Sequence, residues 1–199
     1  EEGIKRGMYL LQEDEKATVQ LLGSGVILRE VIKAAKILRE EYQIHSNVYS
    51  VTSFNELARD GMACEEYNRL HPLAQESKET WISQQLRGKD GIVVSATDHM
   101  RAYSEQIRAY LPDSRPFVAL GTDGYGRSDT RGNLRSYFGV DAAHIVVATL
   151  KKLADEGEVD ARLVKDAIST FELDTDRPVA WAPQAVPEVQ AVADYKEEH

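Results

Sequence analysis

The chain has 199 residues, 42% of them hydrophobic, and a formal net charge of -9 at pH 7. A chain of this length buries one hydrophobic core, so we expect one domain rather than two. The excess of acidic side chains disfavours a protein that grips phosphate backbones, because that affinity comes from clustered Lys and Arg. Nucleic acid is therefore not an expected partner.

The sequence shows no sign of a membrane or a secretory address. A membrane-spanning run of about 18 apolar residues is absent, and the start EEGIKRGMYLL lacks the features of a secretory signal. We therefore expect no membrane partner and a cytoplasmic location. The first residue is Glu rather than Met, which suggests a processed product or a segment of something longer.

The first part of the chain has the pattern of an α/β unit. Residues 7–12 are a candidate edge strand, and residues 18–25 read as a strand that ends in a glycine turn. An amphipathic helix over 26–42 follows, because its apolar residues recur every three to four positions: Ile27, Val31, Ala34, Leu38 and Tyr42.

The second strand is predicted at residues 46–53 from its Val, Tyr and Thr content. Ser53 and Glu56 match a capping box, in which each side chain satisfies a free amide of the helix start. The short helix that follows is expected to be interrupted at Gly61 and to end before Pro72.

A helix over 78–86 and a short buried strand over 91–96 come next. We then predict a helix over 97–111, which Thr97 or Asp98 can cap. The last strand is expected at 116–121. Beyond residue 129 the pattern predicts helices at 130–139, 141–157 and 160–171, with Asp141 and Asp160 as caps.

Strands that alternate with helices imply a mostly parallel sheet covered on both faces. We place this domain at residues 1–173. Residues 174–199 contain Pro178, Pro183 and Pro187 and few large apolar side chains, so we expect an extended or disordered tail.

The turn GSGVIL after the first predicted strand resembles a dinucleotide-binding fingerprint only in part. Leu28 occupies the third glycine position, and the next strand ends at Ser53 without the expected acidic residue. A tight strand-to-helix turn with Ser24 as N-cap is the preferred interpretation.

Histidine and cysteine give little support for a metal or nucleophile site. The five histidines lack the spacing of metal ligands. Cys64, the one cysteine, excludes an internal disulfide, and only His71 is near it in sequence as a base. His99 is a candidate because it follows a strand at a helix start, where α/β enzymes place active-site residues.

The segment GTDGYGRSDTR, residues 121–131, is the most distinctive loop. Asp123 and Asp129 could act as acids or metal ligands and Arg127 as an anion clamp, because ligands bind at the carboxyl ends of parallel strands. A purely structural role is equally concrete. Its three glycines permit positive φ and close packing, Ser128 or Asp129 can cap the next helix, and Arg127 can pair with either aspartate.

Four stretches together resemble the carboxyl-terminal domain of the homodimeric bacterial pyruvate dehydrogenase. They are VQLLGSGVILREVIKAAKIL, VYSVTSFNELARDG, LHPL and LGTDGYGRSDTRGNLRSYFGVDAAHIVVATL, and the match runs to about Phe171. Transketolase is a more distant relative, with a last domain that shares the pattern of Tyr125, Gly126, Ser128, Leu134, Phe138 and Gly139. The resemblance implies a three-layer α/β/α fold with a five-stranded, mostly parallel sheet in which one strand runs antiparallel. Residues 7–12 fit that antiparallel strand.

The resemblance also implies where the chemistry lies. The family binds thiamine diphosphate and magnesium between two earlier domains, at a Gly-Asp-Gly followed by Asn-Asn, and this chain has no Asn-Asn. The catalytic histidines and glutamate also belong to those domains, so we expect no catalytic, cofactor-binding or metal residue in this segment. Asp123, Arg127, Asp129 and His99 remain candidate loop or interface residues.

The implied partners are a second copy of the enzyme, the preceding domains and the dihydrolipoyl acyltransferase component, to whose lipoyl groups the intact enzyme transfers the acetyl unit. Two rival hypotheses are a free-standing module that binds a small anion at residues 121–131 and the last domain of a transketolase-type transferase.

Overall fold

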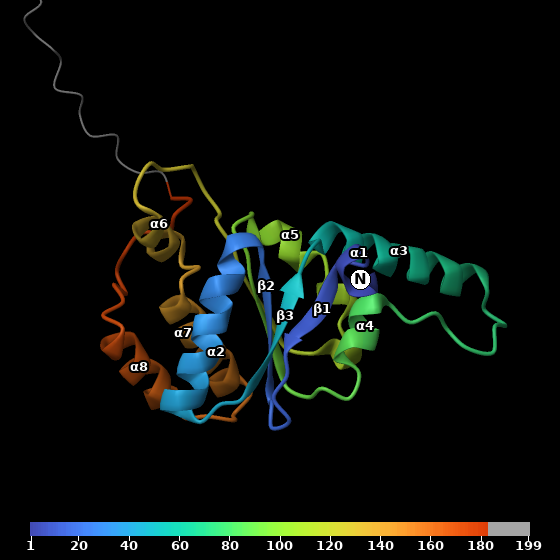
Figure 1. Ribbon diagram of the computed structural model, residues 1–199, viewed down its shortest axis with the longest axis horizontal. Coiled ribbons are helices and arrows are strands. Elements are labelled where there is room, and N and C mark those ends of the chain that lie inside the picture. The colour runs from blue at the N-terminus through green and yellow to red at the C-terminus, as the bar shows by residue number, and fades with distance from the viewer. Residues whose placement is uncertain (183–199) are drawn as a thin grey trace, which may run out of the picture.

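The structure is a computed structural model that describes residues 1–182. Five strands form one sheet in the order β1-β3-β2-β4-β5 (Figure 1). β1 runs antiparallel to β3, and the other neighbours are parallel. The strands are β1 (Met8–Gln12), β2 (Val19–Ser24), β3 (Ser46–Val51), β4 (Ile92–Ala96) and β5 (Phe117–Leu120).

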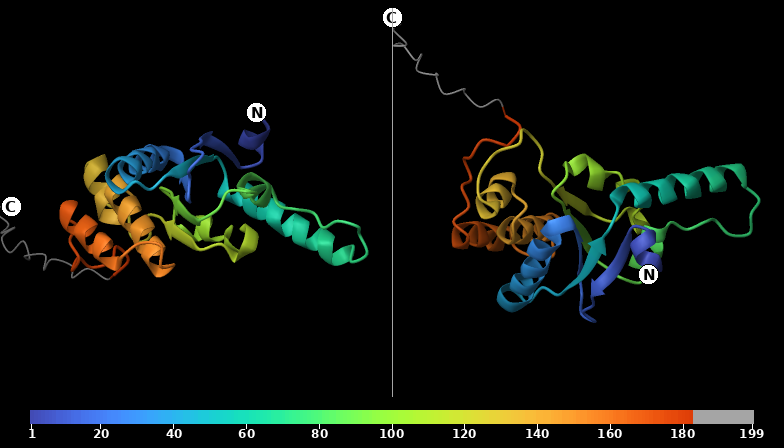
Figure 2. Two further views of the ribbon diagram at one scale, coloured as in Figure 1. Left: turned by 90° about the horizontal axis from the view of Figure 1, so that it is seen from below. Right: turned by 45° about the horizontal axis from the view of Figure 1, so that its top comes forward.

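Helices cover both faces of this sheet (Figures 1 and 2). One face packs against α2 (Leu28–Tyr42), α7 (Ala142–Asp155) and α8 (Ala161–Thr170), and the other against α3 (Phe54–Leu70) and α4 (Trp81–Leu86). The remaining elements are α1 (Glu2–Lys5), α5 (Arg101–Glu105), α6 (Arg131–Phe138) and the 3-10 turns η1 (Gly25–Ile27), η2 (Arg108–Tyr110) and η3 (Pro112–Ser114).

Alternation along the strands explains the two cores. In β2, Val19 and Leu21 point into the core beneath α2 and α7, whereas Leu22 belongs to the core on the other face. All three side chains are fully buried. The sheet is therefore the middle layer of a three-layer α/β/α domain, as the sequence predicts.

All five predicted strands are present, and the antiparallel place of residues 7–12 is confirmed by the pairing of Met8 with Val51. The predicted helix over 26–42 is also confirmed, although its first turn is η1 and α2 proper begins at Leu28. The short helix α1 was not expected from the sequence.

The helix predicted over 97–111 is wrong in extent and in its cap. Only α5 and η2 are helical there, and Thr97 is used differently: its Oγ1 accepts a hydrogen bond from the amide of His99 at 3.2 Å. This local bond lies ahead of the helix, whose N-cap position is Met100. Neither Thr97 nor Asp98 caps α5.

The capping box at Ser53 is half formed. Ser53 Oγ accepts the amide of Glu56 at 3.1 Å, but the Ser53 amide itself donates to the carbonyl of Gly7 at 3.1 Å. Since that amide is already satisfied, the Glu56 carboxylate pairs with Arg59 at 3.3 Å.

Gly61 does not interrupt the helix as predicted: α3 runs through it to Leu70 and ends before Pro72. Gly61 is buried, and a Cβ added to it would lie 2.4 Å from the ring of Tyr110. The glycine therefore serves packing between α3 and η2 rather than a break in α3.

The tail prediction concerns residues mostly outside the described range, since 183–199 are not described. Residues 174–182 form no helix or strand, and Arg177 Nη1 donates to the carbonyl of Ser136 at 2.5 Å. This described part of the tail thus lies against α6. The boundary at residue 173 stays a prediction. No helix within residues 1–182 is both long enough and apolar enough to cross a membrane.

Replacing Gly61 with Ala should lower the free energy of unfolding by about 1–3 kcal/mol, because the new methyl group overlaps the Tyr110 ring. The matched control is Gly132→Ala in α6, where an added Cβ meets no atom within 4 Å. The control should gain up to ~1 kcal/mol from helix propensity. Urea denaturation measures both, and a Gly61→Ala protein as stable as the parent would contradict this packing.

Candidate functional site

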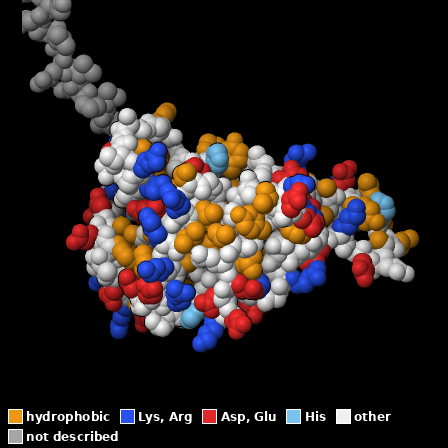
Figure 3. All heavy atoms as spheres, viewed as in Figure 1, with side chains coloured by type: hydrophobic (Ala, Val, Ile, Leu, Met, Phe, Trp, Pro, Cys, Tyr) orange, Lys and Arg blue, Asp and Glu red, His pale blue; other side chains and the backbone are white. Residues whose placement is uncertain are grey.

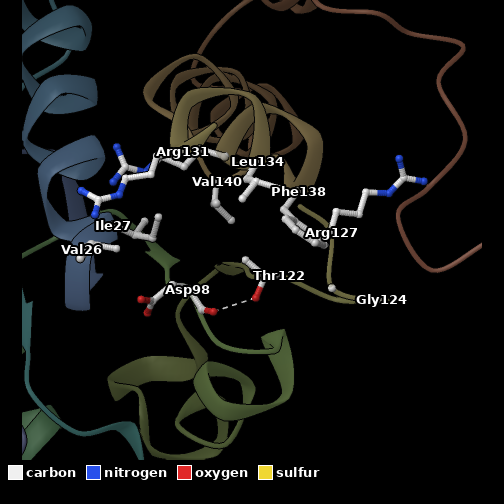
Figure 4. A pocket seen from close by; sticks show the side chains of 12 residues that line it. Val26, Ile27, Asp98, Thr122, Gly124, Arg127, Arg131, Leu134, Phe138 and Val140 are labelled. Atoms are coloured by element: carbon white, nitrogen blue, oxygen red, sulfur yellow. Dashed lines mark hydrogen bonds between the residues drawn. The ribbon is translucent and has the colours of Figure 1, made fainter. Parts of the chain in front are cut away.

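A cavity of about 530 Å³ lies at the carboxyl ends of β2, β4 and β5 (Figure 4). It lies between the start of α2, the loop 121–130 and α6. Its lining residues are Val26, Ile27, Asp98, Thr122, Gly124, Gly126, Arg127, Arg131, Leu134, Arg135, Phe138 and Val140. Parallel strands collect ligand sites at this edge of a sheet, so the cavity is the candidate site.

Asp123 has a structural role within the loop. Its Oδ1 accepts the backbone amide of Arg101 at 3.1 Å, and its Oδ2 lies 2.9 Å from Nε of the same arginine. The carboxylate therefore satisfies one of the free amides at the start of α5, which the sequence assigned to Thr97 or Asp98. Asp123 is half-buried, and its carboxylate is not free to act as an acid because both oxygens contact Arg101.

The loop glycines differ from one another. Only Gly124 of the three has a positive φ, 112°, and a Cβ there would lie 2.5 Å from the carbonyl oxygen of Ala180. Gly121 allows close approach instead, since its Cβ would lie 2.6 Å from the Arg101 amide. Gly126 has neither feature, so the prediction that it permits a tight positive-φ turn is wrong.

Asp129 and Arg127 also have partners that the sequence did not predict. The N-cap of α6 is Thr130, whose Oγ1 accepts the Asn133 amide at 3.3 Å. Asp129 accepts the Thr130 amide at 2.6 Å, and this hydrogen bond lowers the pKa of its carboxyl group. Arg127 pairs with neither aspartate; its guanidinium lies 4.3 Å from the centroid of the Tyr137 ring and points away from the cavity (Figure 4).

His99 lies outside the main cavity, beside a smaller one of about 260 Å³ that Ser24, Asn55 and Tyr103 help to line. The His99 ring is exposed and tilts against Tyr103, with the ring centroids 5.5 Å apart. Its link to the loop is through the backbone, where its carbonyl accepts the Thr122 amide at 2.9 Å. The structure therefore does not bring His99 together with Asp129 or Arg127.

The start of α2 has no side-chain cap. Ser24 occupies the N-cap position of η1, but its hydroxyl accepts no capping hydrogen bond, so the predicted role of Ser24 is wrong. Gly25 has a φ of 56°, and a Cβ there would lie 2.9 Å from Oδ1 of Asp98. The Asp98 carboxylate thus packs against this turn. The backbone carbonyl of Asp98 accepts a hydrogen bond from Thr122 Oγ1 at 2.8 Å (Figure 4).

Sequence reasoning missed the ion pair that holds α6 in place. Glu30 is 5% exposed, and its Oε1 accepts Nη1 of Arg135 at 2.8 Å. Its Oε2 accepts the Ala142 amide at 3.3 Å, and Lys33 Nζ lies 3.1 Å from Oε1. The spacing of the sequence does indicate that Glu30 is buried: it is three residues from Ile27 and four from Ala34, which places it on the apolar face of α2.

Cys64 and His71 do not form a nucleophile pair. Cys64 is buried in α3, and burial raises the pKa of its thiol. The His71 ring stacks on Tyr67 with centroids 4.0 Å apart, and Nδ1 lies 2.8 Å from the Tyr67 carbonyl oxygen. Across residues 1–182, no group of three or more His, Cys, Asp or Glu side chains is placed to hold a metal ion.

Residues 7–141 match the family described as "Transketolase-like TK C-terminal domain". The chain therefore belongs to the family of transketolase-like C-terminal domains. It is 50% identical over 180 residues to the pyruvate dehydrogenase E1 component of Pseudomonas aeruginosa and 51% identical over 179 residues to that of Escherichia coli K12. Each alignment covers 89% of this chain and 20% of the relative, so the chain spans about a fifth of their length.

Solved transketolases share the fold at low sequence identity. That of Campylobacter jejuni is 21% identical with a TM-score of 0.51, over 74% of this chain and 19% of that chain. That of Pichia stipitis, in complex with sedoheptulose 7-phosphate, is 15% identical with a TM-score of 0.55, over 78% of this chain and 19% of that chain. The expected fold and the resemblance to pyruvate dehydrogenase are both confirmed.

Replacing Asp123 with Ala should lower the free energy of unfolding by about 1 kcal/mol, because the backbone amide and the guanidinium of Arg101 both lose their partner. Asp123→Asn is the matched control: it keeps an acceptor oxygen for the amide and should lose less. Urea denaturation of both variants measures the difference. Equal stability of the Ala variant and the parent would show that Asp123 does not fix the loop.

Proposed function

We propose that this chain is the carboxyl-terminal domain of a homodimeric pyruvate dehydrogenase, the first component of the pyruvate dehydrogenase complex. The observation that carries the proposal is the identity of about one residue in two over 89% of the chain to E1 components. At 15–21% identity, the transketolases support the fold alone. A transketolase-type transferase and a free-standing anion-binding module are therefore the weaker candidates.

In this proposal the intact enzyme decarboxylates pyruvate and transfers the acetyl unit to lipoyl groups of the dihydrolipoyl acyltransferase component in the cytoplasm. Thiamine diphosphate supplies the carbanion chemistry when bound, and we assign it and magnesium to the preceding domains. The residues of this chain do not fit that role: Asp123, in the Gly-Thr-Asp-Gly string at 121–124, is held by Arg101. No catalytic step is assigned to this domain.

The proposed contribution of this domain is to hold the dimer and to support the preceding domains. Exposed apolar side chains gather at the edge where β2, β4 and β5 end, and such patches mark interfaces. Tyr125 is 83% exposed, Val26 54%, and Met100 and Trp181 52% each. We place a contact with the preceding domains on this edge.

The first test uses the natural parent protein of this chain, assayed with thiamine diphosphate, magnesium, pyruvate and a lipoyl domain. We expect pyruvate-dependent acetylation of the lipoyl domain by the parent and none by the 199-residue chain alone. Xylulose 5-phosphate with ribose 5-phosphate is the control substrate pair. Turnover of the sugar phosphates without pyruvate, or decarboxylation by the isolated chain, would refute the proposal.

The second test concerns the edge contact. Tyr125→Asp should lower the melting temperature of the parent enzyme but leave that of the isolated chain unchanged, because the exposed ring has few contacts within this domain. Leu73→Asp is the matched control: its side chain is 95% exposed and lies in the loop between α3 and α4, away from that edge. If the Tyr125→Asp parent enzyme and the control enzyme melt at the same temperature, the proposed contact is not at this edge.

A further inference from the structure

The wall of the main cavity carries two arginines one helical turn apart. Arg131 and Arg135 both come from α6 and both line the cavity (Figure 4). Residues four apart on a helix lie on the same face, where like charges repel each other. Repulsion between the two guanidinium groups therefore destabilises the ligand-free domain, and a bound negative charge would relieve it.

Positive charge exceeds negative charge in the part of the cavity lining that residues 1–182 form, where Asp98 is the one acidic residue beside Arg131 and Arg135. Glu30 is shared between Arg135 and Lys33, so one carboxylate faces two cations. The Arg131 side chain makes no hydrogen bond or ion pair with any part of the chain that the structure describes. Acidic side chains exceed basic ones by 33 to 24 in the whole sequence, yet this wall keeps an excess of positive charge.

Arg135 is fixed in place before any ligand arrives. Its side chain is 22% exposed, and the contact to the buried Glu30 carboxylate uses Nη1 alone. The remaining guanidinium donors stay free to bond elsewhere, because an arginine carries five N–H groups. A guanidinium held in this way loses little conformational entropy on binding an oxyanion.

Part of the lining is apolar. The apolar side chains are those of Ile27, Leu134, Phe138 and Val140. Ile27 and Val140 also belong to the core that covers this face of the sheet, and Phe138 packs against that core. Asp98 and Thr122 are the polar groups on the loop side (Figure 4). A volume of about 530 Å³ suits a small organic molecule rather than a lone ion.

We propose that this cavity binds a small organic anion that has one carboxylate or phosphate group on an apolar body. The anionic group pairs with the guanidinium groups of Arg131 and Arg135, which match the geometry of such oxyanions. The apolar body lies against Leu134 and Phe138. The proposal concerns a ligand of this domain and does not depend on the reaction of the parent enzyme.

The test is calorimetric titration of the 199-residue chain with three probes: phenyl phosphate, benzoate and the neutral benzyl alcohol. We expect saturable binding of at least one anionic probe with a dissociation constant of roughly 1 mM or tighter, and none of benzyl alcohol. The tighter anion identifies the head group as phosphate or carboxylate. Inorganic phosphate should bind more weakly than phenyl phosphate, because it leaves the apolar wall uncovered.

Arg131→Gln should weaken binding of the preferred anion about tenfold without changing the melting temperature, since this side chain has no partner in residues 1–182 to lose. Arg162→Gln is the matched control, an exposed arginine on α8 outside the cavity. Absence of saturable binding of either anion would overturn the proposal. Equal affinities of Arg131→Gln and the parent, or equal binding of benzyl alcohol, would do the same.

Discussion

The buried carboxylate of Glu30 is the interaction on which the frame of the cavity depends. It joins three helices, because it accepts Arg135 of α6 and the first amide of α7 while it sits on the apolar face of α2. A buried charge is tolerated only when it is paired and hydrogen-bonded. Since Glu30 is 5% exposed, α6 has to stay where Arg135 reaches it, and the arginine wall of the cavity follows from that position.

The distinctive loop 121–130 is shaped by segments far from it in sequence. Asp123 holds the start of α5, Gly124 makes room for the backbone at Ala180, and Gly121 makes room for Arg101. These contacts join β5, α5 and the described part of the tail at one edge of the sheet (Figure 1). Asp123, Asp129 and Arg127, whose charges first suggest catalysis, all have partners within this domain.

Two surfaces remain at the same edge, and they differ in character. Exposed apolar side chains such as Tyr125 suit contact with another protein domain, whereas the cavity beside them combines arginines with an apolar lining. Ligand pockets occur preferentially at domain interfaces. Figure 3 shows a band of apolar side chains across the middle of the visible face and a group of basic side chains at its left. This edge of the sheet thus carries both the exposed apolar side chains and the cavity.

Local patterns in the sequence predict the five strands, the amphipathic face of α2 and the caps Asp141 and Asp160, because periodicity and capping act over a few residues. The family follows from the resemblance of four long stretches of the sequence. The sequence did not determine the partners of charged groups. Asp123 bonds to an amide 22 positions away and Arg135 to a carboxylate 105 positions away. Such pairs form only when packing brings distant segments together, and they place Asp123 at the start of α5 and Arg135 in the wall of the cavity. Gly61 shows the same limit: its need for space comes from the ring of Tyr110, which no local pattern reveals.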